Sequence, residues 1–226
     1  MAKQIGWYLP EQLILKITLA GSEPKIWRRV EVHSGMTLEA LHDVIQCVFE
    51  WDDSHMHHFI VTPGGKTTRM ALREATYFQP SPPGGFVDVF NLGEGRSKGT
   101  DEVIIAQILT GDCNQIIYEY DFGDSWNHIV KVEKRTPGGE QSFVPVCLAG
   151  LNAGPSDDMG GTDGYCQWVQ ALRDEDNPMH EEAVDWLGED FDPERFDLEQ
   201  VNKRLKSVFK PLPRKPRKPR KKAKKG

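Results

Sequence analysis

The feature that most constrains the fold is a pair of β-rich runs separated by a three-residue turn. Residues 115–122 and 126–133 are rich in apolar, β-branched and aromatic side chains, and Gly123-Asp124-Ser125 stands between them. Glycine accepts a positive φ and aspartate bonds to nearby backbone amides, so both residues suit a tight turn. The pattern predicts a β-hairpin, and the fold must therefore contain at least one antiparallel strand pair.

The N-terminal half predicts a second strand pair followed by a helix. Residues 12–20 and 25–33 are apolar or partly alternating runs on either side of a Gly-Ser-Glu-Pro turn, which predicts a hairpin. Thr37 can cap a helix that runs to about Trp51, because apolar residues recur after it at helical spacing. Another strand is expected at residues 55–62.

The remaining segments predict a long loop and several helices. Residues 63–100 contain many prolines and glycines and are expected to be mostly loop, with one short strand near residues 86–90. A short helix is expected from Asp101 through Leu109. This order of elements predicts an α+β fold with a mixed or antiparallel sheet, packed helices and a helical C-terminal third. The helices of that third are expected at residues 164–173, 180–187 and 197–208.

Charge divides the chain into two parts, a domain at residues 1–209 and a tail at residues 210–226. The tail contains ten Lys and Arg residues and no Asp or Glu, whereas the domain contains 18 basic and 34 acidic residues. The formal charge is therefore -16 on the domain and +10 on the tail. Prolines and the lack of apolar residues predict a disordered tail. The acidic domain argues against a continuous basic groove for duplex nucleic acid.

Composition excludes several protein classes. The four cysteines lie far apart without a Cys-x-x-Cys pair, which argues against a disulfide framework or a zinc ribbon and favours reduced thiols. No apolar run is long enough to span a membrane, and the N-terminus lacks the apolar core of a signal peptide. No glycine-rich phosphate loop follows a strand. These features favour a cytoplasmic protein without a membrane partner or a nucleotide cradle.

Several ordered strings of the chain carry a family resemblance. The most distinctive is Tyr-Glu-Tyr-Asp-Phe-Gly-Asp-Ser-Trp-Asn-His at residues 118–128. Others are Ile26-Trp27-Arg28-Arg29; Trp51 with His55, His58 and Phe59; Cys147-Leu148-Ala149-Gly150; Asp158-Met159-Gly160-Gly161; Gly164-Tyr165; and Phe191-Asp192-Pro193-Glu194 with Phe196 and Asn202. Over about residues 10–208 the chain resembles the plasmid pRiA ORF-three-like family, also described as the insertion-element passenger TnpR family.

The resemblance implies a compact α+β domain found on plasmids and mobile elements, with no established catalytic activity. The name TnpR is resolvase-like. Nothing in the chain resembles the nucleophile region of a serine recombinase, so this name implies no DNA strand exchange by this chain. Where many family members carry Cys-Pro-Pro-Glu-Asp, this chain has Gly154-Pro155-Ser156-Asp157-Asp158. A cysteine that would pair with Cys147, or share a metal with it, is therefore missing from this string.

The predicted hairpin carries the first candidate site. Asp121, Asp124 and His128 lie within eight residues, and two carboxylates with an imidazole suit acid–base catalysis or a divalent metal. The alternative is structural. On a strand His128 shares a face with Trp126, so its imidazole would lie in the core with a hydrogen-bonded partner. The sequence leaves both interpretations open.

Histidines near the third expected strand form the second candidate site. His55 and His57 point to the same side of a strand, and with His128 they would supply imidazole ligands for zinc or another transition metal. Phe59 lies on that same face, so a packed strand is the alternative interpretation. Convergence of these histidines with Asp121 in space would favour the metal site.

Two further features bear on binding. The acidic loop at residues 157–164 alternates carboxylates with glycines but lacks the ligand pattern of an EF-hand. A turn that caps the next helix is therefore favoured over a Ca²⁺ or Mg²⁺ site. Trp27 beside Arg28 and Arg29 can bind a phosphate or a base if the trio is exposed, whereas the other tryptophans fit an apolar core.

The basic tail is the candidate nucleic-acid contact. A dense polycation binds nucleic acid or other polyanions through counterion release, without sequence preference and with a steep salt dependence. The alternatives are a solubility tail or an intramolecular partner of the acidic domain. The cations expected to make these contacts are Arg214, Lys215, Arg217, Lys218, Arg220, Lys221, Lys222, Lys224 and Lys225.

Two functions of different classes follow from these features. The first is a non-enzymatic adaptor of a mobile element, whose domain binds a protein or a small ligand and whose basic arm holds it near nucleic acid. The second is a metal-dependent hydrolase or nuclease. In this second function a divalent metal activates water. The site would consist of Asp121, Asp124, His128, His55 and His57.

Overall fold

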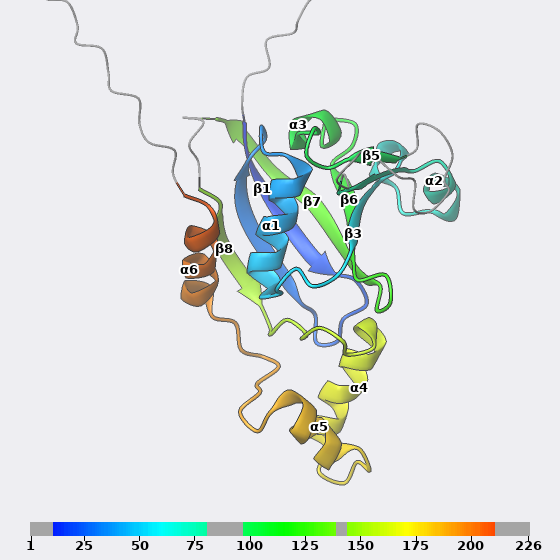
Figure 1. The fold of residues 1–226 in the computed structure, drawn as a ribbon, viewed down its shortest axis with the longest axis vertical. Helices are drawn as coiled ribbons and strands as arrows, with labels where there is room; N and C mark the ends of the chain where they lie inside the picture. The colour runs from blue at the N-terminus through cyan, green and yellow to red at the C-terminus, as the bar shows by residue number, and fades with distance from the viewer. Residues whose placement is uncertain (1–10, 81–96, 139–143, 211–226) are drawn as a thin grey trace, which may run out of the picture.

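The computed structural model describes residues 11–80, 97–138 and 144–210. These residues form an eight-stranded mixed sheet with helices, in the strand order β5-β4-β3-β6-β7-β1-β2-β8 (Figure 1). The strands are β1 (Glu11–Leu19), β2 (Trp27–His33), β3 (His57–Val61), β4 (Thr76–Gln79), β5 (Ser97–Gly99), β6 (Gln115–Tyr120), β7 (Trp126–Pro137) and β8 (Val146–Leu151). The helices are α1 (Leu38–Phe49), α2 (Arg69–Arg73), α3 (Ile105–Ile108), α4 (Gly161–Arg173), α5 (His180–Leu187) and α6 (Leu198–Val208), with a short 3₁₀ helix η1 (Pro63–Gly65). The predicted α+β class is confirmed.

The central strands form because buried and solvent-facing residues alternate along them. On β1 the side chains of Leu13, Leu15, Ile17 and Leu19 are buried, and the residues between them are only half-buried. β1 pairs antiparallel with β2 on one side and with β7 on the other. Every described strand pair is antiparallel except β4 with β5. The two predicted hairpins, β1 with β2 and β6 with β7, are both confirmed.

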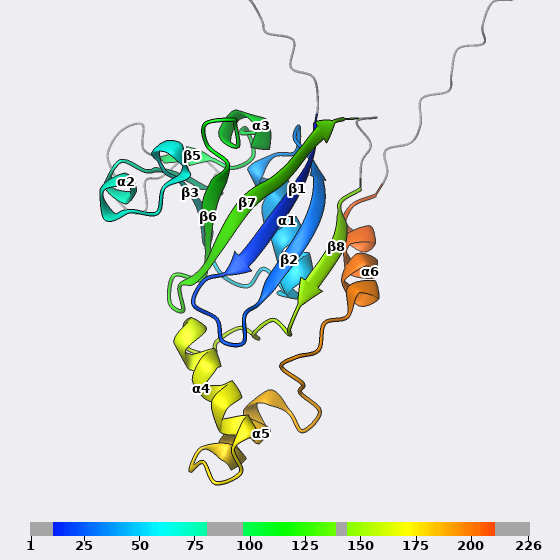
Figure 2. The ribbon, with the colours of Figure 1, turned by 180° about the vertical axis from the view of Figure 1, so that it is seen from behind.

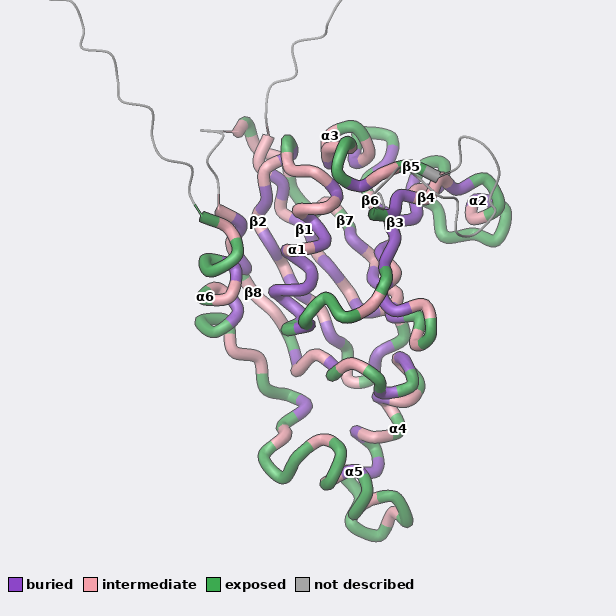
Figure 3. The backbone as a smooth tube through the Cα atoms, in the orientation of Figure 1, coloured by how far each residue is buried: buried purple, intermediate pink, exposed green. Residues whose placement is uncertain are grey.

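Helix α1 covers one face of this sheet. It begins after Thr37, whose hydroxyl accepts a hydrogen bond from the Ala40 amide as the sequence predicts. It ends at Phe49, because Glu50 adopts a left-handed conformation with φ 65°. Figure 1 shows α1 lying across the strands, and Figure 2 shows the opposite face of β1, β2 and β7 without a helix over it. The buried residues concentrate between α1 and the sheet (Figure 3).

Strand β8 lies at one edge of the sheet and is missed by the sequence patterns. It pairs with β2, and its outer side faces α6. Asn202 of α6 accepts from the Cys147 amide and donates to the Cys147 carbonyl, both at 2.9 Å. An edge strand otherwise presents unpaired backbone groups, and the Asn202 side chain satisfies two of them. This long-range contact leaves no periodic signal in residues 146–151.

Other differences from the expected elements concern short segments. The expectation of a loop is wrong for the described part of residues 63–100, which contains α2, β4 and β5. These elements are three to five residues long, too short to show a period. The helix expected from Asp101 begins at Ile105. The strand expected near residues 86–90 lies outside the described residues, whereas the three C-terminal helices lie close to their expected positions.

The basic tail beyond Lys210 also lies outside the described residues. The four cysteines are free thiols, in agreement with the sequence. Among the described residues, none of the helices has the length and apolar character needed to cross a membrane.

Candidate metal centre

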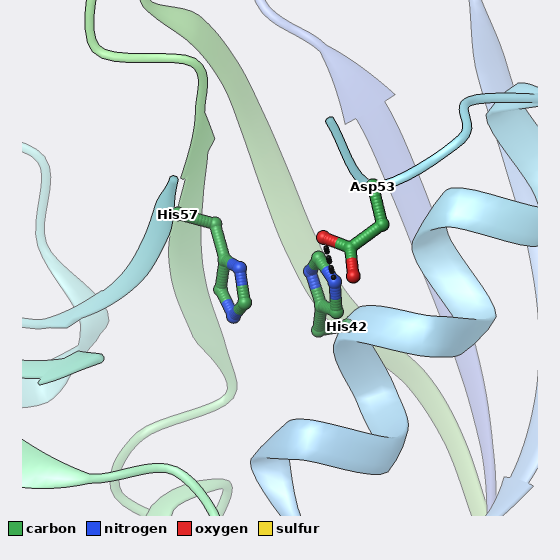
Figure 4. A group of neighbouring side chains, drawn as sticks. All are labelled: His42, Asp53 and His57. Atoms are coloured by element: carbon green, nitrogen blue, oxygen red, sulfur yellow. Dashed lines mark hydrogen bonds and ion pairs between the residues drawn. The ribbon is translucent and has the colours of Figure 1, made fainter. Parts of the chain in front are cut away.

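The connection between α1 and β3 brings two histidines and an aspartate together (Figure 4). His42 belongs to α1, Asp53 to the connection, and His57 is the first residue of β3. The chain reverses after α1 through left-handed conformations at Glu50 and Asp53, and β3 then pairs with β6. One ligand atom from each of the three side chains lies within 4.8 Å of the other two.

A closed ring of hydrogen bonds fixes the proton of His42. The Asp53 amide donates to Gln46 Oε1 at 2.9 Å, so the Gln46 side-chain nitrogen is the atom that donates to the Tyr118 hydroxyl at 3.1 Å. The Tyr118 hydroxyl therefore donates its own proton to His42 Nδ1 at 2.8 Å. This leaves the His42 proton on Nε2, which donates to Asp53 Oδ1 at 3.0 Å.

His57 is held by stacking on His42. The two ring centroids are 3.6 Å apart and the ring planes are 10° from parallel. Only 4% of His57 is exposed, and its Nε2 is buried without a hydrogen-bond partner among the described residues. Burial lowers the pKa of His57 to about 2, with smaller effects from His42 and His58. His57 is therefore a neutral imidazole at physiological pH, the form that binds metals.

The cluster is negative and opens to solvent on the Asp53 side. The Asp53 side chain is 61% exposed, and a hollow of about 240 Å³ adjoins it, lined also by Gln46 and Arg204. Burial lowers the pKa of His42, although the charge of Asp53 opposes this shift. Burial raises the pKa of the nearby Asp43 to about 6, with the charges of Glu39 and Asp53 acting in the same direction. The carboxylates of Asp43, Asp52 and Asp53 line this hollow together with the guanidinium of Arg204.

Two imidazoles and one carboxylate form a ligand set for Zn²⁺ and other transition metals. Zinc ligands lie about 2.0–2.1 Å from the ion, which places tetrahedral ligand atoms about 3.4 Å apart, so the cluster has to contract to bind one. A metal lies in the plane of each imidazole that it binds, so two stacked rings do not both reach one ion. Binding therefore requires one ring to turn. It also requires His42 to move its proton from Nε2 to Nδ1, where the Tyr118 oxygen accepts it.

A second cluster consists of His55, which precedes β3, Asp121, which follows β6, and Asp158, which precedes α4. His55 Nδ1 is 3.7 Å from Asp121, and His55 Nε2 is 3.7 Å from Asp158. The two ring nitrogens thus face different carboxylates, an arrangement that suits an imidazole held between two acids. The Asp158 side chain is 74% exposed. The rest of the acidic loop forms a turn in which Gly160 is the N-cap of α4.

His128 lies in the core, apart from both clusters. It is fully buried on β7 and contacts the rings of Phe49 and Trp51 at centroid distances of 4.5 and 5.2 Å. Its Nδ1 is 3.1 Å from the Trp126 carbonyl oxygen. Burial lowers the pKa of His128 to about 3. The three histidines predicted as metal ligands, His55, His57 and His128, therefore lie in three different surroundings.

The predicted catalytic residues are likewise separated. Asp124 lies in the hairpin turn, where its carboxylate accepts from the Gly160 amide at 3.0 Å and ties the turn to the start of α4. Asp121 joins the second cluster, and its Oδ1 accepts from the Gly123 amide at 2.9 Å. Of the predicted catalytic and metal residues, the structure brings together Asp121 and His55.

The sequence patterns single out neither His42 nor Asp53 as a ligand. A signal for His42 does exist. It is a polar residue on the buried stripe of α1, next to Leu41 and one turn before Ile45. A histidine on such a stripe requires a buried partner, and Tyr118 supplies it from the sheet.

The comparisons with known proteins identify the family. Residues 11–200 match the family described as Plasmid pRiA4b ORF-3-like protein. The chain belongs to this family. The uncharacterized protein y4hQ of Sinorhizobium fredii is 28% identical over 193 residues, which cover 84% of this chain and 89% of that protein. A crystal structure of a protein of unknown function from Methanosarcina mazei Go1 is similar, with 30% identity, a TM-score of 0.71, and coverage of 86% of this chain and 99% of the other. Neither description of these two relatives states an activity.

Proposed function

We propose that the chain binds a transition-metal ion of the zinc class through His42, Asp53 and His57. The observation that best supports the proposal is the convergence of the three side chains, one ligand atom of each lying within 4.8 Å of the other two. Burial keeps the His57 imidazole neutral, the form that binds metals. A metal ion shared with His42 and Asp53 would use this imidazole and would compensate the charge of the carboxylate.

A bound ion would keep an open coordination position. Three protein ligands are typical of catalytic zinc sites, in which water occupies the fourth position. That position would face the solvent-exposed side of Asp53. Zinc lowers the pKa of its bound water to about 7 and so generates hydroxide near neutral pH. The proposal therefore favours hydrolysis of an ester or phosphodiester, the second of the two functions that follow from the sequence, but with a different set of residues.

Metal content and metal affinity of the full chain test this proposal. We expect stoichiometric Zn²⁺ in the wild-type protein and a loss of affinity of at least about 100-fold in His57→Ala. Asp53→Asn is the milder variant, because asparagine still accepts the His42 hydrogen bond but lacks the anionic ligand, and it should lose at least about tenfold. His55→Ala is the matched control, two positions from His57, and should keep the wild-type affinity.

A folded wild-type chain that takes up no Zn²⁺ would contradict the proposal. Wild-type affinity in both His57→Ala and Asp53→Asn would contradict it as well. Circular dichroism verifies that each variant is folded. Cleavage of bis-p-nitrophenyl phosphate by the zinc-loaded chain, lost in His57→Ala and retained in His55→Ala, tests the hydrolytic step.

A second candidate function is polyanion binding through residues 210–226, which the +10 charge of the tail favours. It corresponds to an adaptor whose basic arm holds the acidic domain near nucleic acid. Deletion of residues 210–226 should abolish retention on immobilised DNA and RNA at low salt. Retention that the deletion leaves unchanged would show that the tail is not needed for nucleic-acid binding.

A further inference from the structure

The open face of the sheet carries an apolar row that crosses five strands. Its members lie opposite one another in the strand register and alternate along β1 and β2 with the buried residues. Figure 2 shows this open face of the sheet without a helix over it. The members of the row are half-buried or exposed. The apolar members are Ile117 on β6, Ile129 on β7, Trp27 on β2 and Leu151 on β8, and Thr18 on β1 is the one polar side chain between them. A row of this kind offers a flat apolar surface with one aromatic ring.

A basic row runs beside the apolar row, two residues along each strand. Lys131 of β7 lies opposite Lys16 of β1, and Lys16 lies opposite Arg29 of β2. Neighbouring strands are about 4.8 Å apart, so three cations follow one another across about 10 Å. The domain as a whole is strongly acidic, which makes this group of cations a local exception.

The two rows meet at Trp27. Lys16 Nζ lies 4.9 Å and Arg29 Cζ 5.0 Å from the centroid of the Trp27 ring. Beside the ring is a hollow of about 530 Å³, lined by Lys16, Lys25, Trp27 and Leu151 and also by Glu23. This volume is in the range of small-ligand pockets. An aromatic platform, a hollow and flexible cations therefore lie side by side.

Carboxylates near the basic row reduce its positive charge. Glu133 is the extra residue of a bulge in β7 and pairs with Arg29 at 2.5 Å. In the next row Glu31 of β2 lies opposite Ile14, and Lys134 of β7 lies opposite Ile14 from the other side. The basic row thus keeps a net positive charge. Glu133 would compete with a bound phosphate for Arg29.

We infer that this open face binds a single-stranded nucleic acid, with a base on Trp27 and phosphates on the basic row. Single strands are bound by aromatic rings on which bases stack and by cations that follow the backbone. A base that takes the ring face releases Lys16 and Arg29 toward the phosphates. The acidity of the domain as a whole argues against binding of a duplex along a continuous basic groove. The inference is independent of the metal proposal.

Binding of a fluorescent oligo(dT) by the full chain tests the inference, with inorganic polyphosphate of equal charge as the competitor. Trp27→Ala should weaken oligo(dT) binding by about 5- to 150-fold, the range for loss of one stacked base, and Trp27→Phe should restore part of it. Trp186→Ala on α5 is the matched control, because Trp186 is 56% exposed and lies outside the rows. Trp27→Ala should leave polyphosphate binding unchanged.

The cations have their own readout. Lys16→Gln and Lys131→Gln should each lower the slope of log affinity against log salt by about 0.7, whereas Lys203→Gln on α6 should not. Glu133→Gln should tighten binding, because it frees Arg29. A tail that bound these polyanions would do so through charge alone, so equal affinity for oligo(dT) and polyphosphate would overturn the inference. Equal oligo(dT) affinities of Trp27→Ala and Trp186→Ala would also overturn it.

Discussion

Arg28 and Arg29 are neighbours on β2 but lie on opposite faces of the sheet. Arg28 faces α1, is fully buried, and donates to the carbonyl oxygens of Val48, Trp27 and Leu151 at 2.8–3.0 Å. Burial lowers its pKa to about 10. Arg29 lies on the open face, where its side chain is 34% exposed. Burial thus decides whether the same residue type holds the fold together or is available to a ligand.

Histidines follow the same division. His57 and His128 are both buried and both kept neutral by burial, which lowers their pKa values to about 2 and about 3. His55 lies near the surface between two carboxylates. A buried neutral imidazole has a defined protonation state at neutral pH. His57 contacts His42 of α1 and His128 contacts Phe49 of α1, so both neutral imidazoles lie on the face that α1 covers.

The largest predicted effect is a loss of stability in acid, caused by the buried histidines of the covered face. In the unfolded chain His57 and His128 titrate near pH 6.5, whereas the folded chain takes up these protons only near pH 2 to 3. The unfolded state thus binds more protons between these values, and stability falls as the pH drops below about 6.5. From pH 7 to pH 5 the two residues together should cost about 4 kcal/mol of unfolding free energy.

Urea denaturation at both pH values measures this loss. In His128→Gln the contribution of one histidine is absent, so the loss should shrink by about 2 kcal/mol. An unchanged pH dependence in this variant would mean that His128 is protonated in the folded chain or exposed to solvent.

The next largest effect should be the difference in unfolding free energy between substitutions of Arg28 and of Arg29. Arg28→Met leaves buried carbonyl groups without donors and should cost about 3 kcal/mol or more of unfolding free energy. Arg29→Met removes a surface ion pair with Glu133 and should cost about 0–1 kcal/mol. Denaturant melts of both variants at pH 7 make the comparison, and equal costs would refute the division between the two faces.

Local signals allowed much of this fold to be predicted. The hairpin around Gly123 and the Thr37 cap depend on residues close in sequence, so their patterns are visible before folding. Strand β8 depends on Asn202 from a distant helix, and no pattern within the strand reports that contact. Tertiary packing rather than local preference therefore determines where β8 forms.

The candidate site was only partly predictable for the same reason. His57, predicted as a metal ligand, belongs to the proposed site, whereas His55 and Asp121 meet in the second cluster. His42 meets His57 because Glu50 reverses the chain and β3 then joins the sheet beside β6. That convergence requires the whole topology, which spacing along the chain does not encode.

Loss of a single hydroxyl should give the smallest of the stability losses predicted for buried groups. Tyr118→Phe removes the donor to His42 Nδ1 and the acceptor for Gln46, at a cost of about 1–2 kcal/mol of unfolding free energy. It should also weaken zinc binding by about 10- to 100-fold, because His42 loses the partner that orients it. Tyr120→Phe is the control, since its hydroxyl contacts Ser54 instead. Equal zinc affinity in the two variants would separate the hydrogen-bond ring from the metal site.

X-ray absorption at the zinc edge of the loaded full chain examines the proposed centre itself. We expect two imidazole ligands, with nitrogen and oxygen scatterers at about 2.0–2.1 Å, and the loss of one imidazole in His57→Ala. A sulfur scatterer at about 2.3 Å, or a spectrum with one imidazole that His57→Ala leaves unchanged, would show that the ion binds elsewhere.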